Sequence, residues 1–371
     1  MTDGMQRARA DAPAPRGGRS VPGLLALLTL SALAGWLFDR LGAPLPWMIG
    51  PLIVTAIVFM TLAPAITVPA TIRPGAQIVV ATQVGLAFSP DAFQMLAELA
   101  PVMVGMALTT GVCVVIVSYA LMRLTGQKFS QAFLSTVPTS PVEAANMAQD
   151  AGMPVTPVIL SQTLRLALVV ITVPFALYAV EGWPAGQRPV ITLAAPDPLG
   201  MALLVLMGVV GAWGFKRLRI ANPNFLGPLA VAAGIAATGH APAPFPPLVL
   251  ALAQVVLGTW LGATFRRDFL TTALAQTVTS LASSLVLLAL CSACAVGIAA
   301  LAGVNWQVLV LGAAPGGVVE MALTAKFLAQ NVVLITTFHL VRIFIFIPNI
   351  PWIVRMILRW ENRRNDREKP T

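Results

Sequence analysis

Charge is what this sequence has least of. Only 10% of its 371 residues are Asp, Glu, Lys or Arg, whereas a soluble domain carries roughly 25%. Hydrophobic residues make up 57%, and the mean hydropathy is +0.84. A surface built from so few charged side chains does not suit water, so the composition excludes an ordinary soluble domain and indicates a lipid environment.

Metal-binding residues are also scarce, with two histidines and three cysteines in the whole chain. No group of His, Cys, Asp and Glu has the spacing of metal ligands. The sequence contains no Walker-type phosphate loop, no G-x-S-x-G motif and no helix-turn-helix in a polar segment. We therefore expect no enzymatic activity, no cofactor and no direct nucleic-acid partner.

Long apolar runs take the place of these missing features. A run of about 20 residues can cross the hydrocarbon core of a bilayer as a helix. Such runs recur along the chain, which predicts an all-α integral membrane protein. They are Val21–Phe38, Ala100–Met122, Val155–Val180, Leu199–Phe215, Leu248–Phe265, Leu270–Ala302 and Asn331–Val354.

The sequence matches itself without gaps at an offset of 177 residues. Coincidences of rare residues carry this signal, since matching leucines mean little in an apolar chain. They pair Trp36 with Trp213, Gly50-Pro51-Leu52 with Gly227-Pro228-Leu229, Glu143 with Glu320 and Arg165 with Arg342. We predict two copies of one unit, residues 21–181 and 198–358. The linker is 182–197, and basic tails occupy 1–20 and 359–371.

The orientation of the two copies depends on the segment Gln131–Asp150, which is less apolar than its neighbours and contains Pro138 and Pro141. If it crosses the membrane, each copy has six spans and the copies are parallel. If it enters and returns, each copy has five spans and the copies are inverted. In the inverted arrangement with a cytoplasmic N-terminus, nearly all basic residues of the loops and tails lie on the cytoplasmic side, and only Arg40 and Arg188 lie outside. The positive-inside rule favours this distribution.

We therefore predict about ten transmembrane helices in two inverted five-span repeats, each with a re-entrant segment broken by Pro or Gly. Both termini are predicted to be cytoplasmic. The two breaks follow Val137 and Ala314. Helices that restart after such breaks point free N–H groups at the interior, where they favour an anion. This is the usual construction of a transporter's central site.

The candidate substrate-binding or gating residues lie in and beside these breaks. They are Pro138, Thr139, Ser140, Glu143 and Arg165 in the first copy, and Pro315, Gly316, Gly317, Glu320 and Arg342 in the second. Because an unpaired charge inside the membrane costs several kcal/mol, we predict the ion pairs Glu143–Arg165 and Glu320–Arg342. These pairs are either structural salt bridges or part of a substrate or proton site.

A Gly-Pro pair recurs in the second apolar segment of each copy, at Gly50-Pro51 and Gly227-Pro228. Proline inside a helix removes a hydrogen bond and bends the axis. Two interpretations remain open at this point: simple packing, or a hinge used in gating.

Two stretches, Pro44–Leu52 and Ala314–Met321, resemble the signature segments of the membrane AbrB family, also called the AbrB duplication family. The resemblance covers almost the whole chain, but the first break reads Pro138-Thr139-Ser140 where the second has Pro-Gly-Gly. It implies a multi-pass protein of the bacterial inner membrane, unrelated to the soluble DNA-binding AbrB. The family carries two functional labels, regulation of gene expression and ammonia monooxygenase.

We expect a secondary transporter of a small solute, for which an anion is one candidate. The alternative is a membrane regulator or sensor that acts indirectly on gene expression. An oxygenase is disfavoured because two scattered histidines are too few to hold copper or iron. The expected partners are the lipid bilayer, an unidentified small solute and, as an alternative to a monomer, further copies of the chain.

Overall fold

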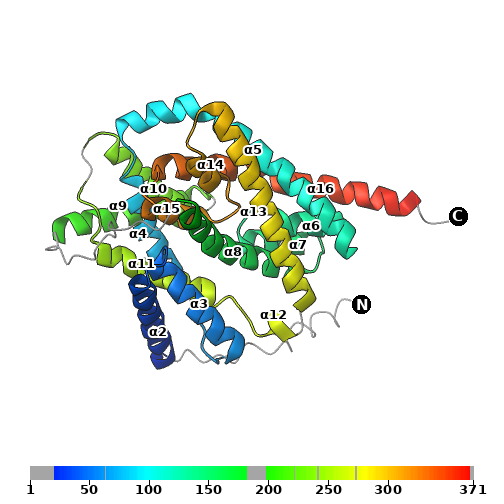
Figure 1. Ribbon diagram of the computed structural model, residues 1–371, viewed down its shortest axis with the longest axis horizontal. Coiled ribbons are helices and arrows are strands. Elements are labelled where there is room, and N and C mark those ends of the chain that lie inside the picture. The colour runs from blue at the N-terminus through cyan, green and yellow to red at the C-terminus, as the bar shows by residue number, and fades with distance from the viewer. Residues whose placement is uncertain are drawn as a thin grey trace.

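A computed structural model of the chain describes residues 21–62, 64–181, 198–220, 222–239, 242–271 and 274–367 (Figure 1). The predicted tail 1–20 and linker 182–197 lie outside the described residues. Residues 359–367 of the predicted C-terminal tail continue the last helix.

The described residues form helices and no strands. The first half contains α2 (Val21–Arg40), α3 (Pro46–Thr61), the 3-10 turn η1 (Ala70–Ile72), α4 (Arg73–Gly85), α5 (Pro90–Thr125), α6 (Phe129–Thr136), α7 (Pro141–Asp150) and α8 (Val155–Glu181). The second half contains α9 (Pro198–Arg217), α10 (Pro223–Ala236), α11 (Pro247–Gly262), α12 (Asp268–Thr271), α13 (Leu274–Ala302), α14 (Trp306–Ala313), α15 (Val318–Phe327) and α16 (Val332–Arg367).

The helix bounds recur at the offset seen in the sequence. The pairs α2 and α9, α6 and α14, and α7 and α15 each begin and end 177 residues apart. The long helix α5 corresponds in position to α12 and α13 together. Each half therefore contains the same order of long, short and interrupted helices.

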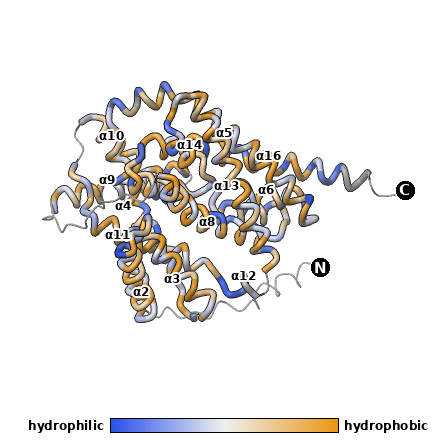
Figure 2. The backbone as a smooth tube through the Cα atoms, in the orientation of Figure 1, coloured by the Kyte–Doolittle hydropathy of each residue, from blue (hydrophilic) through white to orange (hydrophobic). Residues whose placement is uncertain are grey.

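Six helices in the described part of the chain are long and apolar enough to cross a membrane: α2, α5, α8, α9, α13 and α16. Three shorter apolar helices, α3, α10 and α11, have 14 to 16 residues. Hydrophobic residues dominate most of these elements (Figure 2). The chain is thus a multi-pass membrane protein, although six helices rather than about ten reach spanning length on their own.

The helices form two groups. The first group packs α2, α3 and α4 against α9, α10 and α11, and the second packs α5 to α8 against α13 to α16. Figure 1 shows α2, α3, α9 and α11 on one side and α13 and the end of α16 on the other, while α5 runs across the top from above α10. The interrupted helix pair α14 and α15 lies between the two sides.

Glycines let the helix backbones of the first group approach one another closely. A Cβ on Gly50 of α3 would lie 2.7 Å from the carbonyl oxygen of Ala34 in α2. A Cβ on Gly227 of α10 would overlap the carbonyl group of Gly211 in α9. The helix continues through the following proline in both cases. These contacts favour the packing interpretation of the Gly-Pro pairs over the hinge.

Two buried clusters show how the second group is arranged. Leu99, near the start of α5, packs in one cluster with Ala299, near the end of α13. Val117, towards the end of α5, packs in the other cluster with Leu287 of α13. The helices α5 and α13 therefore run in opposite directions.

The same two clusters place α8 and α16 antiparallel. Leu177, near the end of α8, shares a cluster with Leu334 at the start of α16. Val158, near the start of α8, shares the other cluster with Ile357. The two interrupted helix pairs sit between these four long helices.

Candidate functional site

Both predicted breaks are real interruptions of the helical backbone. Helix α6 ends at Thr136 and α7 begins at Pro141, while α14 ends at Ala313 and α15 begins at Val318. A residue before proline avoids the helical conformation because the proline ring would collide with it. Val137 and Ala314, which precede Pro138 and Pro315, accordingly have ψ values of 130° and 129°.

Arg165 of α8 lies at the first break, with only 1% of its surface exposed. A guanidinium group has five N–H donors, and here every one has an acceptor. The acceptors are the carbonyl oxygens of Thr136 (3.0 Å), Val137 (3.2 Å), Thr139 (3.3 Å) and Pro315 (3.0 Å), and Oε1 of Gln162 (2.5 Å).

Arg342 of α16 repeats this arrangement at the second break and is 4% exposed. Its two terminal nitrogens donate to backbone carbonyls and to one ring nitrogen. The acceptors are the carbonyl oxygens of Ala313 (3.5 Å), Ala314 (2.7 Å) and Gly316 (3.0 Å), and Nδ1 of His339 (2.8 Å).

The two arginines meet at one segment of backbone. Arg342 binds the carbonyls of Ala314 and Gly316, and Arg165 reaches across from the other half to the carbonyl of Pro315 between them. Three consecutive carbonyls thus join the two halves of the chain. The carbonyls that end α6 and α14 lack helical partners and carry the negative ends of the helix dipoles, which favours cations there.

The predicted ion pairs Glu143–Arg165 and Glu320–Arg342 are therefore wrong. The salt bridge that the structure records within the described ranges joins Arg266 and Asp268, 3.1 Å apart and exposed. Backbone carbonyls, together with Gln162 and His339, accept the hydrogen bonds of the two buried guanidinium groups instead. The prediction failed because it considered only side chains as partners for a buried charge.

The two glutamates occupy the starts of α7 and α15. Thr139 Oγ1 donates to Oε2 of Glu143 at 2.9 Å, and the Glu143 N–H donates to Ser140 Oγ at 3.2 Å. The carboxylate of Glu320 folds over Gly317, where any Cβ would overlap it. A carboxylate at a helix start is stabilised by the free N–H groups and the dipole. The protein's own carboxylates thus lie where an anion was expected.

One cation from the first helix group approaches Glu320. Arg73, at the start of α4, lies close enough for its charge to interact with that of Glu320. Its guanidinium also stacks on Trp260 of α11, 4.1 Å from the ring centroid. The interaction between Arg73 and Glu320 therefore crosses from one helix group to the other, whereas Trp260 belongs to the same group as Arg73.

Sequence reasoning missed Gln162 and His339. Both lie three residues before the arginine of their half, and both bridge that arginine to the preceding half-helix. Gln162 Nε2 donates to the carbonyl of Leu134 at 2.7 Å, and His339 Nε2 lies 2.9 Å from that of Leu311. Their shared position was visible at the 177-residue offset, but the change of residue type concealed it.

No group of three or more His, Cys, Asp or Glu in the described ranges could hold a metal ion. The three cysteines do meet, since Cys113 of α5 lies 3.9 Å from Cys294 of α13 and also contacts Cys291. All three are free thiols.

Apolar helices around two interrupted helix pairs, each closed by a buried arginine, define a multi-pass membrane protein with an internal polar centre. A family described as "Transition state regulatory protein AbrB" matches residues 2–140 and 47–358. The chain belongs to this AbrB family, as its signature segments predicted.

Two relatives match nearly from end to end. The "Uncharacterized protein YhjN" of Bacillus subtilis (strain 168) is 25% identical over 365 residues, covering 92% of this chain and 94% of the relative. The "Putative regulator AbrB" of Escherichia coli (strain K12) is 24% identical over 346 residues, covering 92% and 98%.

Proposed function

We propose that this chain is a secondary transporter of a small solute in the bacterial inner membrane. The observation that carries the proposal is the matched pair of interrupted helices whose broken ends meet at Arg165 and Arg342. Non-helical backbone at membrane depth is tolerated only where protein or a water-filled cavity lines it. Paired breaks in corresponding positions of two halves are the best pointer to a transport site.

The proposal includes an internal duplication with inverted copies of five spans and a re-entrant hairpin. The antiparallel pairs α5 with α13 and α8 with α16 support it, since corresponding helices of parallel copies would run the same way. The hairpin is supported by the cluster that contains Phe129, at the start of α6, together with Ala151, after the end of α7. The two arms of the hairpin thus pack together in one cluster, as expected of a segment that enters and returns.

The orientation is tested by labelling two exposed positions with a thiol reagent that does not cross membranes. Asp91 lies at the start of α5 and Arg267 just before α12. In intact cells, the variant Asp91→Cys should be labelled above the background of the unaltered chain, and Arg267→Cys should not. In inside-out vesicles the pattern should reverse. Labelling of both variants in the same preparation would contradict the inverted copies.

We assign the coupling role to Glu143 and Glu320 rather than to the arginines. All five donors of Arg165 are used by the protein, so its guanidinium offers nothing to a solute. In the part of the chain that the structure describes, neither carboxylate forms a salt bridge, and both lie in the first turn of a helix that restarts after a break. They can exchange a proton or bind a small cation as the solute moves. Arg73, on the other helix group, supplies a competing charge for Glu320.

The experiment begins with thermal-shift screening of the purified chain against a metabolite library, because a specific ligand stabilises the folded state by mass action. The ligand found is then tested for uptake into proteoliposomes. Glu320→Gln should reduce uptake at least about tenfold, since amides neither carry the charge nor exchange the proton. The melting midpoint should stay near that of the unaltered chain.

Glu98→Gln serves as the matched control, because Glu98 is an exposed carboxylate on α5. It should transport normally. A library without any stabilising solute, or uptake unchanged in Glu320→Gln, would count against the transporter.

A membrane regulator that acts indirectly on gene expression is the second candidate. The printed name of the E. coli relative favours it. Such a protein needs a cytoplasmic contact, so removing residues 1–20 or 364–371 should abolish a transcriptional response. Neither the truncated nor the unaltered chain should then take up a solute. Uptake by the purified chain alone distinguishes the transporter from this alternative.

A further inference from the structure

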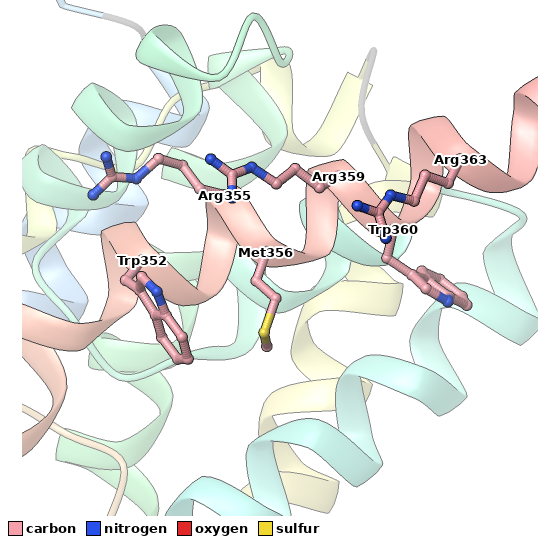
Figure 3. A pocket seen from close by; sticks show the side chains of 6 residues that line it. All are labelled: Trp352, Arg355, Met356, Arg359, Trp360 and Arg363. Carbon is pink, nitrogen blue, oxygen red and sulfur yellow. The ribbon is translucent and has the colours of Figure 1, made fainter.

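The last turns of α16 carry two parallel rows of side chains. Arg355, Arg359 and Arg363 follow one edge of the helix, and Trp352, Met356 and Trp360 follow the other (Figure 3). Each row has the i, i+4, i+8 spacing that aligns side chains along a helix. Together these six residues line a groove of about 520 Å³, and we call them the C-terminal stripe.

The C-terminal stripe is exposed. The relative exposures of Trp352, Met356 and Trp360 are 59%, 51% and 53%. The opposite face of the same helix is buried, with Val354 at 3% and Ile357 at 7%. The stripe therefore faces away from the protein, and this end of α16 projects beyond the other helices (Figure 1).

The position of the C-terminal stripe along α16 matches a membrane surface. A helix that enters the hydrocarbon core near Val332 leaves it about 20 residues later, near Trp352. Trp side chains concentrate at the level of lipid headgroups, with one edge apolar and the other wet. The three arginines follow Trp352 at 3, 7 and 11 residues, which places them in the headgroup layer and just beyond it.

Among the residues that the structure describes, no carboxylate forms a salt bridge with the arginines of the stripe. Glu361 is the sole acidic residue between Trp352 and Arg363. Its two carboxylate oxygens accept hydrogen bonds from the N–H and hydroxyl of Ser130, at 3.0 and 2.9 Å.

The same two bonds hold the stripe in place. Ser130 lies in the first turn of α6, so Glu361 ties the end of α16 to the start of the first hairpin. The rows are thus parts of an anchored helix rather than of a free tail. A prearranged row of guanidinium groups loses less conformational entropy when it binds.

We propose that the C-terminal stripe is a binding site for the headgroup of an anionic phospholipid. Guanidinium groups bind phosphate through paired hydrogen bonds. Neighbouring arginines such as Arg355 and Arg359 therefore flank the lipid phosphate. The indole rings and Met356 contact the glycerol and the upper parts of the acyl chains. The stripe therefore suits a ligand that carries both a negative charge and an apolar tail. Free phosphate lacks the apolar tail.

The test uses the full-length chain, delipidated in an uncharged detergent and titrated with short-chain phosphatidylglycerol while the thermal midpoint is followed. Phosphatidylcholine with the same chains and inorganic phosphate serve as comparison ligands. The midpoint should rise with phosphatidylglycerol alone. The triple variant Arg355→Gln, Arg359→Gln, Arg363→Gln should weaken this binding about tenfold or more, because each basic residue near an anionic surface contributes substantially to binding.

A second triple variant, Lys216→Gln, Arg217→Gln, Arg219→Gln, removes the same charge from the exposed end of α9 and the turn that follows it. It should bind phosphatidylglycerol within about twofold of the unaltered chain, since the stripe contributes about tenfold or more. Equal weakening in both triple variants would overturn the proposal, as would equal stabilisation by phosphatidylcholine or by inorganic phosphate. If the first triple variant alters only the size of the solubilised particle and not lipid binding, the stripe is an interface with a second copy and the proposal is wrong.

Discussion

Arg165→Met is expected to lower the free energy of unfolding by about 4 kcal/mol or more, because each buried polar group left without a partner costs about 1–3 kcal/mol. The substitution keeps an apolar side chain of similar length but removes all five donors. Carbonyls from both breaks lose their partner, including that of Pro315 in the other half. Whole proteins are stable by only about 5–15 kcal/mol, so little folded protein should remain. Denaturation of the detergent-solubilised protein measures the loss.

Arg123→Met is the control for Arg165→Met, because Arg123 is exposed near the end of α5. It should change the free energy of unfolding by less than about 0.5 kcal/mol. If Arg165→Met matched this control, the guanidinium would not be the bond between the two breaks.

Gln162 and His339 each lie three residues before the buried arginine of their half. Substitutions at His339 test whether the hydrogen bonds matter or the residue type itself. Gln162 does in the first half what His339 does in the second, accepting from the arginine and bonding a carbonyl of the half-helix. His339→Gln should therefore fold nearly as well as the unaltered chain. His339→Leu, which leaves Arg342 and Leu311 without this partner, should cost about 2–3 kcal/mol.

The sequence allowed the positions of the two helix breaks to be predicted, but not the hydrogen bonds made there. Proline positions and the 177-residue offset pointed to the breaks and to both arginines. The partners of those arginines could not be predicted, because backbone carbonyls have no signature in the sequence. Whether a buried charge meets a carboxylate or a helix end depends on how the helices are placed in space.

The number of spanning helices was predicted less well, for a related reason. Apolar composition shows that a segment avoids water, but its helical length depends on where prolines and turns interrupt it. Helix α4 has only 13 residues, since it starts at Arg73 after a 3-10 turn and ends at Gly85. Helices α10 and α11 are shorter than a spanning helix and are held by close packing in the first group.

Gly227→Ala is expected to destabilise the protein by about 3 kcal/mol, at the upper end of the usual cost of overpacking. The new methyl group would overlap the carbonyl of Gly211 in α9, and backbone atoms cannot rotate away as a flexible side chain can. Helices α9 and α10 would have to separate. The free energy of unfolding measured by denaturation gives the cost directly.

Gly234→Ala, on the same helix, supplies the matched comparison. A Cβ at Gly234 meets nothing within 4 Å, and alanine favours a helix over glycine by up to about 1 kcal/mol. The two substitutions make the same chemical change seven residues apart, yet they should shift stability in opposite directions. A gating hinge would behave differently, since Gly227→Ala would then leave the unfolding free energy intact and slow only the conformational change. Equal stability of the two variants would therefore restore the hinge interpretation for Gly227-Pro228 and, through the corresponding contact of Gly50 with Ala34, for Gly50-Pro51.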